Sequence, residues 1–156
     1  MVKNKPSAHG LSQRDGTAVP LHLQIATDPT VLSAVREDLD AWARLVGLVD
    51  EQADAFVLAT YEAVANAIEH GYREQHNGIV TVLTWRTVDR TVVVEVSDHG
   101  QWRTPPADPG TRGQGIPLMR ALADDVKIDH DDQGTTVRLH WRLSGRSAKG
   151  RRDGAD

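Results

Sequence analysis

Apolar residues follow two different spacings along the chain, and the spacing predicts where helices and strands lie. Steps of three and four over 31–46 predict a helix that begins at Asp28, as its N-cap, and ends at Gly47. The other segments with a helical period are about 51–73 and about 116–124.

Alternation of apolar and polar residues predicts several short strands. A turn at Asp89-Arg90 joins two of them into a hairpin. The order is strand, helix, helix, strand, strand, loop, helix, strand, strand. Hairpins grouped beside helices predict an α+β fold, with the helices layered on one face of the sheet. The predicted strands are 21–25, 79–86, 91–97, 126–128 and 135–143.

Composition and charge place one folded domain between two tails. The 156 residues are 39% hydrophobic and 26% charged, which is typical of a globular protein. The segments 1–20 and 144–156 carry excess Lys and Arg and almost no large apolar residues, so we expect them to be disordered and 21–143 to fold. The folded part is therefore more acidic than the net charge of −4, which argues against nucleic acid as a ligand.

Two further features concern the compartment. The chain has no cysteine, which excludes disulfides and a cysteine nucleophile and suits a reducing cytoplasm. It also has no apolar run long enough to cross a bilayer and no signal peptide. We therefore expect a cytoplasmic protein without a membrane partner.

The second predicted helix carries a narrow polar row. Glu62, Asn66 and His70 are spaced by four, so their side chains stack along the helix axis, and Glu69 lies in the same wedge. An acid, a carboxamide and an imidazole in one row can accept a proton, hold a metal ion or bind a polar group. A solvated stripe is the alternative, although such stripes usually contain Lys or Arg and this one contains neither.

The strand at 91–97 ends in a carboxylate on its apolar side. Val92, Val94 and Val96 share one face, and Asp98 is the next residue on that face. Gly100 follows where backbone could approach a ligand closely. Asp98 therefore either begins a turn or accepts a hydrogen bond from an exocyclic amine such as that of adenine.

Two more segments could contribute to a site. Gly113 and Gly115 lead directly into the helix at 116–124, and backbone N–H groups at a helix start suit a phosphate, with Arg112 as a nearby cation. An ordinary surface loop would explain the same residues. The Thr135 hydroxyl faces inward at the start of the last strand, where it either lines a site or only reflects the strand preference of threonine.

These segments together resemble the GHKL ATPases. Each motif alone is weak, but all of them occur in the family's order and span almost the whole of 21–143. The residues at 62–70 and 115–119 are similar to those of the anti-sigma factor serine/threonine kinases, which are stand-alone bacterial GHKL proteins. The N box and the first, second and last glycine boxes correspond to Glu62-x-x-x-Asn66, Asp98-x-Gly100, Gly113-x-Gly115 and Gly134-Thr135.

The resemblance implies a two-layer α/β sandwich of the Bergerat type with a mixed, mostly antiparallel sheet, bound ATP and Mg2+, and commonly a homodimer. It implies that Asn66 holds Mg2+, that Glu62 is the catalytic base and that Asp98 binds the adenine amino group. The other residues implied in nucleotide binding are His70, Gly100, Arg112, Gly113, Gly115, Ile116 and Thr135.

The function implied by this resemblance is that of an ATP-dependent protein serine/threonine kinase. It would act as an anti-sigma factor in bacterial partner switching, holding a sigma factor and phosphorylating an anti-sigma factor antagonist. A nucleotide-binding module without turnover and an interaction domain without a ligand are the alternatives. The presence of Glu62 favours the kinase, because ATP binding alone needs no general base.

Overall fold

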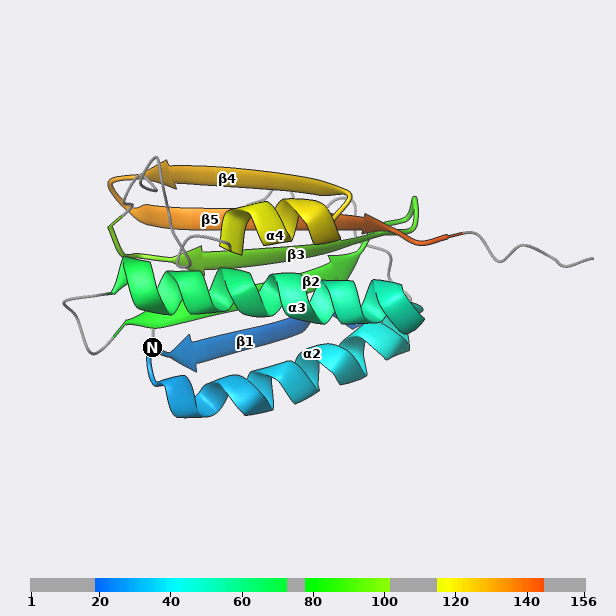
Figure 1. The fold of residues 1–156 in the computed structure, drawn as a ribbon, viewed down its shortest axis with the longest axis horizontal. Coiled ribbons are helices and arrows are strands. Elements are labelled where there is room, and N and C mark those ends of the chain that lie inside the picture. Colours follow the sequence, from blue (N-terminus) through cyan, green and yellow to red (C-terminus); the bar gives the residue numbers. More distant parts are fainter. Residues whose placement is uncertain (1–18, 73–77, 102–114, 145–156) are drawn as a thin grey trace, which may run out of the picture.

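The computed structural model describes residues 19–72, 78–101 and 115–144 of the chain. These residues form two layers, a five-stranded sheet and a set of helices that cover one of its faces (Figure 1). The α+β class and the one-sided helix layer are as the sequence predicts. The two predicted tails lie almost entirely outside the described residues, so the domain limits at 21 and 143 stay predictions.

Each predicted helix and strand is present, with differences at its ends. Asp28 accepts a hydrogen bond from the Thr30 N–H at 2.9 Å, but the turn that it caps is a short 3-10 helix before the α-helix. The second helix changes from an α-helix to a π turn after Asn66. The elements are β1 (Leu21–Ala26), η1 (Pro29–Val31), α2 (Leu32–Val46), α3 (Asp50–Asn66), η2 (Ala67–Gly71), β2 (Ile79–Arg86), β3 (Thr91–Asp98), α4 (Gly115–Leu122), β4 (Asp125–Asp131) and β5 (Gly134–Arg142).

The strands lie in the order β1-β2-β3-β5-β4, and each neighbouring pair is antiparallel. The antiparallel part of the expected mixed sheet is thus confirmed, and no parallel pair occurs among the described strands. Short hairpins join β2 to β3 and β4 to β5, and a short connection can only join antiparallel neighbours.

The hydrophobic core lies between the inner face of the sheet and helices α2 and α3. The stripe predicted on α2 is buried at Val35, Leu39 and Trp42. Phe56 of α3 joins the layers, because its ring centroid lies 5.7 Å from that of Trp42 and 5.1 Å from that of Trp141 on β5. The indole N–H of Trp141 also donates to the Leu122 carbonyl at 2.8 Å, which ties the end of α4 to the sheet.

Candidate functional site

The residues singled out in the sequence gather at one end of the molecule. The end of α3, the end of β3, the start of β5 and the start of α4 all lie there (Figure 1). The sheet register sets Asp98 of β3 directly opposite Thr135 of β5. The π turn η2 contacts both of these strands, so it connects the end of α3 to the end of β3.

Asp98 is a buried carboxylate on the helix-covered side of the sheet. Its exposed fraction is 8%, the same as that of Thr135 opposite it. One carboxylate oxygen accepts the Gly100 N–H at 2.8 Å. Burial raises the pKa of Asp98, and this effect exceeds the opposing effects of the backbone amides of Gly100 and Thr135 and of the nearby His99. A partly desolvated acceptor at a strand end is suited to a hydrogen bond from an amine.

Gly134 allows the backbone of Asp98 to come this close. Gly134 has φ +137°, in the region that favours glycine, and a Cβ there would overlap the carbonyl oxygen of Asp98. The sequence shows Gly134 as part of a glycine motif, yet gives no sign that it packs against Asp98 of the neighbouring strand. Gly134 is thus a supporting residue that the sequence-based site lacked.

Asn66 and Gly115 form the second half of the site. Asn66 is the last residue of α3, and Gly115 is the buried first residue of α4. A Cβ at Gly115 would lie 2.6 Å from Nδ2 of Asn66 and 3.0 Å from its Oδ1. Two segments predicted to serve one ligand therefore lie in contact. Ile116, the next residue of α4, packs against the hydrophobic core.

The π turn after Asn66 is an unexpected feature of this helix. Residues Ala67–Gly71 widen the last turn of the helix, and such turns are frequent at functional sites. His70 lies within this turn, and only its backbone is described. Its expected place near phosphate stays a prediction.

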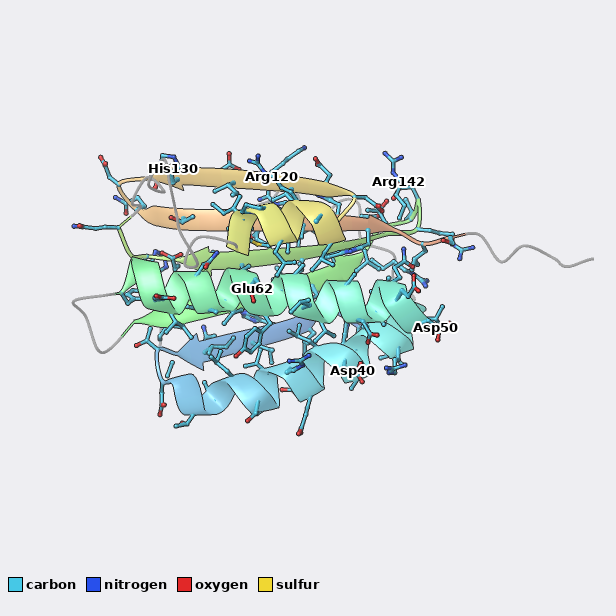
Figure 2. The ribbon with its side chains drawn as sticks, viewed as in Figure 1. Asp40, Asp50, Glu62, Arg120, His130 and Arg142 are labelled. Atoms are coloured by element: carbon cyan, nitrogen blue, oxygen red, sulfur yellow. The ribbon has the colours of Figure 1, made fainter. Side chains whose placement is uncertain are left out.

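Glu62 lies one helical turn before Asn66 and is half-buried. Figure 2 shows it in the helix layer, and it lies four residues before the C-terminal end of α3. Its carboxylate has no hydrogen-bond or ion-pair partner within the described part of the chain. A carboxylate in this position can accept a proton from an incoming group. The other two predicted site residues, Arg112 and Gly113, lie outside the described residues.

Tyr72 is a further residue that the sequence did not bring to attention. It follows η2 directly, and its hydroxyl contacts the backbone of His99, the residue after Asp98, at 2.8 Å. In the sequence, the tyrosine after His70-Gly71 is predicted only to lie near the end of a helix. Its role becomes visible when the two chain segments are seen together.

These residues fit ATP and Mg2+. Asp98 offers a buried acceptor for an adenine amine, and the missing side chain at Gly115 lets the Asn66 amide lie against the start of α4. The Asn66 amide oxygen is a hard donor of the kind that Mg2+ prefers. The described residues contain no cluster of three His, Cys, Asp or Glu that could hold a metal ion.

One structural finding concerns the membrane. None of the helices within the described residues is both long and apolar enough to cross a bilayer.

Comparison with known proteins identifies the family of this fold. A model of the histidine kinase-like ATPase domain matches residues 25–141. The serine-protein kinase RsbW of Bacillus velezensis is 28% identical over 140 residues, which cover 80% of this chain and 86% of the relative. The anti-sigma F factor of Heyndrickxia coagulans is 34% identical over 100 residues, which cover 56% of this chain and 67% of the relative.

Solved structures show the same fold. The structure of the RsbU and RsbW domains of Rv1364c from Mycobacterium tuberculosis superposes with a TM-score of 0.67 and 30% identity, over 81% of this chain and 33% of that one. The histidine kinase domain of a blue-light activated kinase from Erythrobacter litoralis EL346 has a TM-score of 0.54 at 19% identity, which shows the fold alone. From its fold and the match over 25–141, the chain belongs to the histidine kinase-like ATPase domain family.

Proposed function

We propose that this protein is an ATP-dependent protein serine/threonine kinase that acts as an anti-sigma factor. The observation that carries the proposal is the contact between Asn66 and Gly115, one helical turn from a half-buried Glu62 with no described partner. The relatives named serine-protein kinase RsbW and anti-sigma F factor support it. Its substrate would be an anti-sigma factor antagonist, phosphorylated on Ser or Thr.

Asp98 and Thr135 would bind the base of the nucleotide. The buried carboxylate of Asp98 accepts a hydrogen bond from the adenine amine, directly or through water. Gly100 keeps one carboxylate oxygen in place through its N–H, and the carboxylate has lone pairs left to accept a further hydrogen bond from the base. Hydrogen bonds to a charged acceptor are stronger than neutral ones, which makes this contact a strong part of the recognition.

Asn66 and the start of α4 would hold the phosphate end. The Asn66 oxygen would be a ligand of Mg2+, and the backbone N–H groups from Gly115 onward would bind phosphate oxygens with the help of the helix dipole. Bound ATP supplies the phosphoryl group that the reaction transfers. His70, Arg112 and Gly113 are proposed contributors on the same side, by the resemblance of their motifs.

Glu62 would act as the general base. If Asn66 holds Mg2+ at the phosphates, the position of Glu62 one turn earlier would bring its carboxylate within reach of a substrate hydroxyl at the γ-phosphate. It would take the proton of a serine or threonine hydroxyl as the hydroxyl oxygen bonds to the γ-phosphorus of ATP and the bond from that phosphorus to the departing ADP breaks. A positioned base typically contributes about 10²–10⁴-fold to the rate. An acid without an ion-pair partner among the described residues suits this step, because no such pair has to be broken first.

The proposed partners follow from the relatives. They are a sigma factor, held by the protein, and an antagonist, which would release its hold on the kinase when phosphorylated. We propose a homodimer as the working assembly and the cytoplasm, where sigma factors and ATP are present, as its compartment.

The proposal is tested by phosphate transfer. The full chain is incubated with labelled ATP, Mg2+ and candidate antagonists encoded nearby, and phosphoserine or phosphothreonine is sought by mass spectrometry. Labelled antagonist that requires Mg2+ supports the kinase. Magnesium-dependent ATP binding and sigma factor binding, without transfer to any antagonist, would instead support a regulatory module without turnover.

A further inference from the structure

Tyr72 links the segment that follows the Asn66 helix to the residue that follows Asp98. It is buried, with an exposed fraction of 7%, and it follows the π turn that ends the Asn66 helix. Its hydroxyl accepts a hydrogen bond from the His99 N–H at 2.8 Å and donates one to the Ile79 carbonyl at 2.9 Å. A single hydroxyl thus joins the start of β2 to the residue that follows β3.

The sheet register explains what this hydroxyl does. Thr81 pairs with Ser97, so extending the same antiparallel register by two residues would set Ile79 opposite His99. The hydroxyl of Tyr72 stands between the His99 N–H and the Ile79 carbonyl. It therefore satisfies both groups while holding the strands apart, and β3 ends at Asp98.

Gly78 fixes the position of the Tyr72 ring. A Cβ on Gly78 would overlap the ring carbons of Tyr72, so the ring lies flat against the glycine backbone. Gly78 does not need a positive φ, which means that the close approach of the ring, and not backbone strain, calls for a glycine. The ring is thus held by packing and the hydroxyl by its two hydrogen bonds.

The segment that Tyr72 holds is the one that presents Asp98. Once the chain has left β3, the Gly100 N–H turns back to donate to the Asp98 carboxylate at 2.8 Å. On the other side, Nδ1 of the His99 ring lies 3.1 Å from the Gln133 carbonyl, within hydrogen-bond distance. Tyr72 and Gln133 therefore hold His99 from two sides, between Asp98 and Gly100.

We propose that Tyr72 is a positioning residue, whose hydroxyl fixes the backbone at His99 so that Asp98 selects a base with an exocyclic amine. This inference rests on the proposed function, because it assumes that Asp98 binds adenine. It adds that selectivity for the base depends on Tyr72, which follows the Asn66 helix. Tyr72 acts through the backbone of His99 and is not proposed to contact the nucleotide. Phosphate binding is expected to be independent of Tyr72.

The test compares two nucleotides that differ at the amine. Inosine triphosphate carries a carbonyl where ATP carries the amine, so the ratio of the two affinities reports the contact of Asp98 with the base. Tyr72→Phe keeps the ring against Gly78 and removes only the hydroxyl. Tyr61→Phe is the matched control, because Tyr61 is the other tyrosine of the chain and its ring lies near Arg36, with the guanidinium carbon 5.9 Å from the ring centroid.

Calorimetry should show that Tyr72→Phe lowers the preference for ATP over inosine triphosphate by about fivefold to tenfold, as expected when a buried N–H loses its acceptor. Tyr61→Phe should keep the wild-type ratio. Adding Tyr72→Phe to Asp98→Asn should cause little further loss of ATP affinity, because residues that act through one contact are not additive. Gly78→Ala, which displaces the ring, should lower the ratio as Tyr72→Phe does.

A purely structural role predicts other results. If Tyr72→Phe folds and keeps the wild-type ratio, or if its effect adds in full to that of Asp98→Asn, the proposal is overturned. If the wild-type protein binds no ATP, the proposed function fails, and hydrogen exchange then decides on Tyr72 without nucleotide. Faster exchange of the His99 amide in Tyr72→Phe supports the positioning role, and unchanged exchange contradicts it.

Discussion

At the scale of the residue, Asp98 is a buried carboxylate at the end of β3. Strand parity set its carboxylate on the apolar side of β3, and the structure confirms that it is buried there. The partners that hold it could not be foreseen. Gly134 and Tyr72 reach Asp98 or its neighbour from distant parts of the chain, and no local pattern encodes such a contact.

Asp98→Asn should weaken ATP binding without unfolding the protein. The amide keeps the shape and an oxygen for the Gly100 N–H, but it loses the charge that makes the hydrogen bond to the adenine amine strong. Because hydrogen bonds to charged groups contribute roughly 1.5–3 kcal/mol, we expect a loss of about tenfold to a hundredfold in affinity by calorimetry. Unchanged ATP affinity would contradict the role of Asp98 in binding adenine.

The same substitution should raise the stability of the nucleotide-free protein at neutral pH. Folding raises the pKa of Asp98, so its contribution to stability is present below the ordinary value of 3.8 and is lost as the pH rises through the raised value. The melting temperature of Asp98→Asn should therefore exceed that of wild type at pH 7, and the difference should shrink toward pH 4. A difference in melting temperature that stays constant with pH would contradict this account, because it would mean that burial of the Asp98 charge does not cause the difference.

Gly134→Ala should reduce both stability and ATP affinity. Its Cβ would overlap the Asp98 carbonyl at a φ that disfavours side chains, and backbone strain of this kind costs of the order of 1–3 kcal/mol before the overlap is added. Gly47→Ala is the matched control, since Gly47 also has a positive φ but nothing lies within 4 Å of a Cβ there. Denaturant unfolding should rank Gly134→Ala as the less stable, and equal losses would show that the contact with Asp98 carries no cost.

At the scale of the element, the periodicity of apolar residues predicts which helices and strands form more reliably than it predicts the residues at which they end. The apolar stripes predicted the helices, but the change to a π turn after Asn66 has no distinct pattern. β4 extends through Asp129, His130 and Asp131. These polar residues interrupt the apolar alternation, so the sequence predicts a strand that ends earlier, at residue 128. Charged residues are a common feature of an edge strand, which must avoid pairing with other chains.

The junction of α3 and α4 supplies the prediction at this scale. Gly115→Ala would put a Cβ 2.6 Å from Nδ2 of Asn66, so the Asn66 amide must move. Alanine has a higher helix propensity than glycine, so stability should change little while the Mg2+-dependent part of ATP affinity falls several-fold. Calorimetry with Mg2+ and with a chelator separates the two parts, and an unchanged Mg2+-dependent part would contradict the position given to Asn66.

At the scale of the whole molecule, one face of the sheet packs against the helices to form the core. The candidate site lies at the end of the molecule where α3 and β3 finish. The sequence predicted this arrangement because hairpins and amphipathic helices leave few ways to bury their apolar faces. It could not show that Phe56 links α2, α3 and β5 through contacts with two tryptophans, because ring packing depends on the crossing of distant elements.

Phe56→Ala should therefore destabilise the entire domain. Removing a fully buried aromatic side chain costs about 3–5 kcal/mol, through lost transfer energy and a cavity between the layers. Val88→Ala, at a residue that is 73% exposed, should change the free energy of unfolding very little. A loss in Phe56→Ala as small as in Val88→Ala would mean that this ring does not join the layers.

Phosphate transfer by Glu62→Gln is the most direct test of the proposed kinase. Glutamine keeps the size of the side chain but cannot accept the proton, and a base contributes little to nucleotide binding. Glu69→Gln, at an exposed position on η2, is the matched control. In single-turnover assays with an antagonist, Glu62→Gln should lose about 10²–10⁴-fold in rate at wild-type ATP affinity, and Glu69→Gln should retain its rate. Transfer by Glu62→Gln at the wild-type rate would contradict its role as the base.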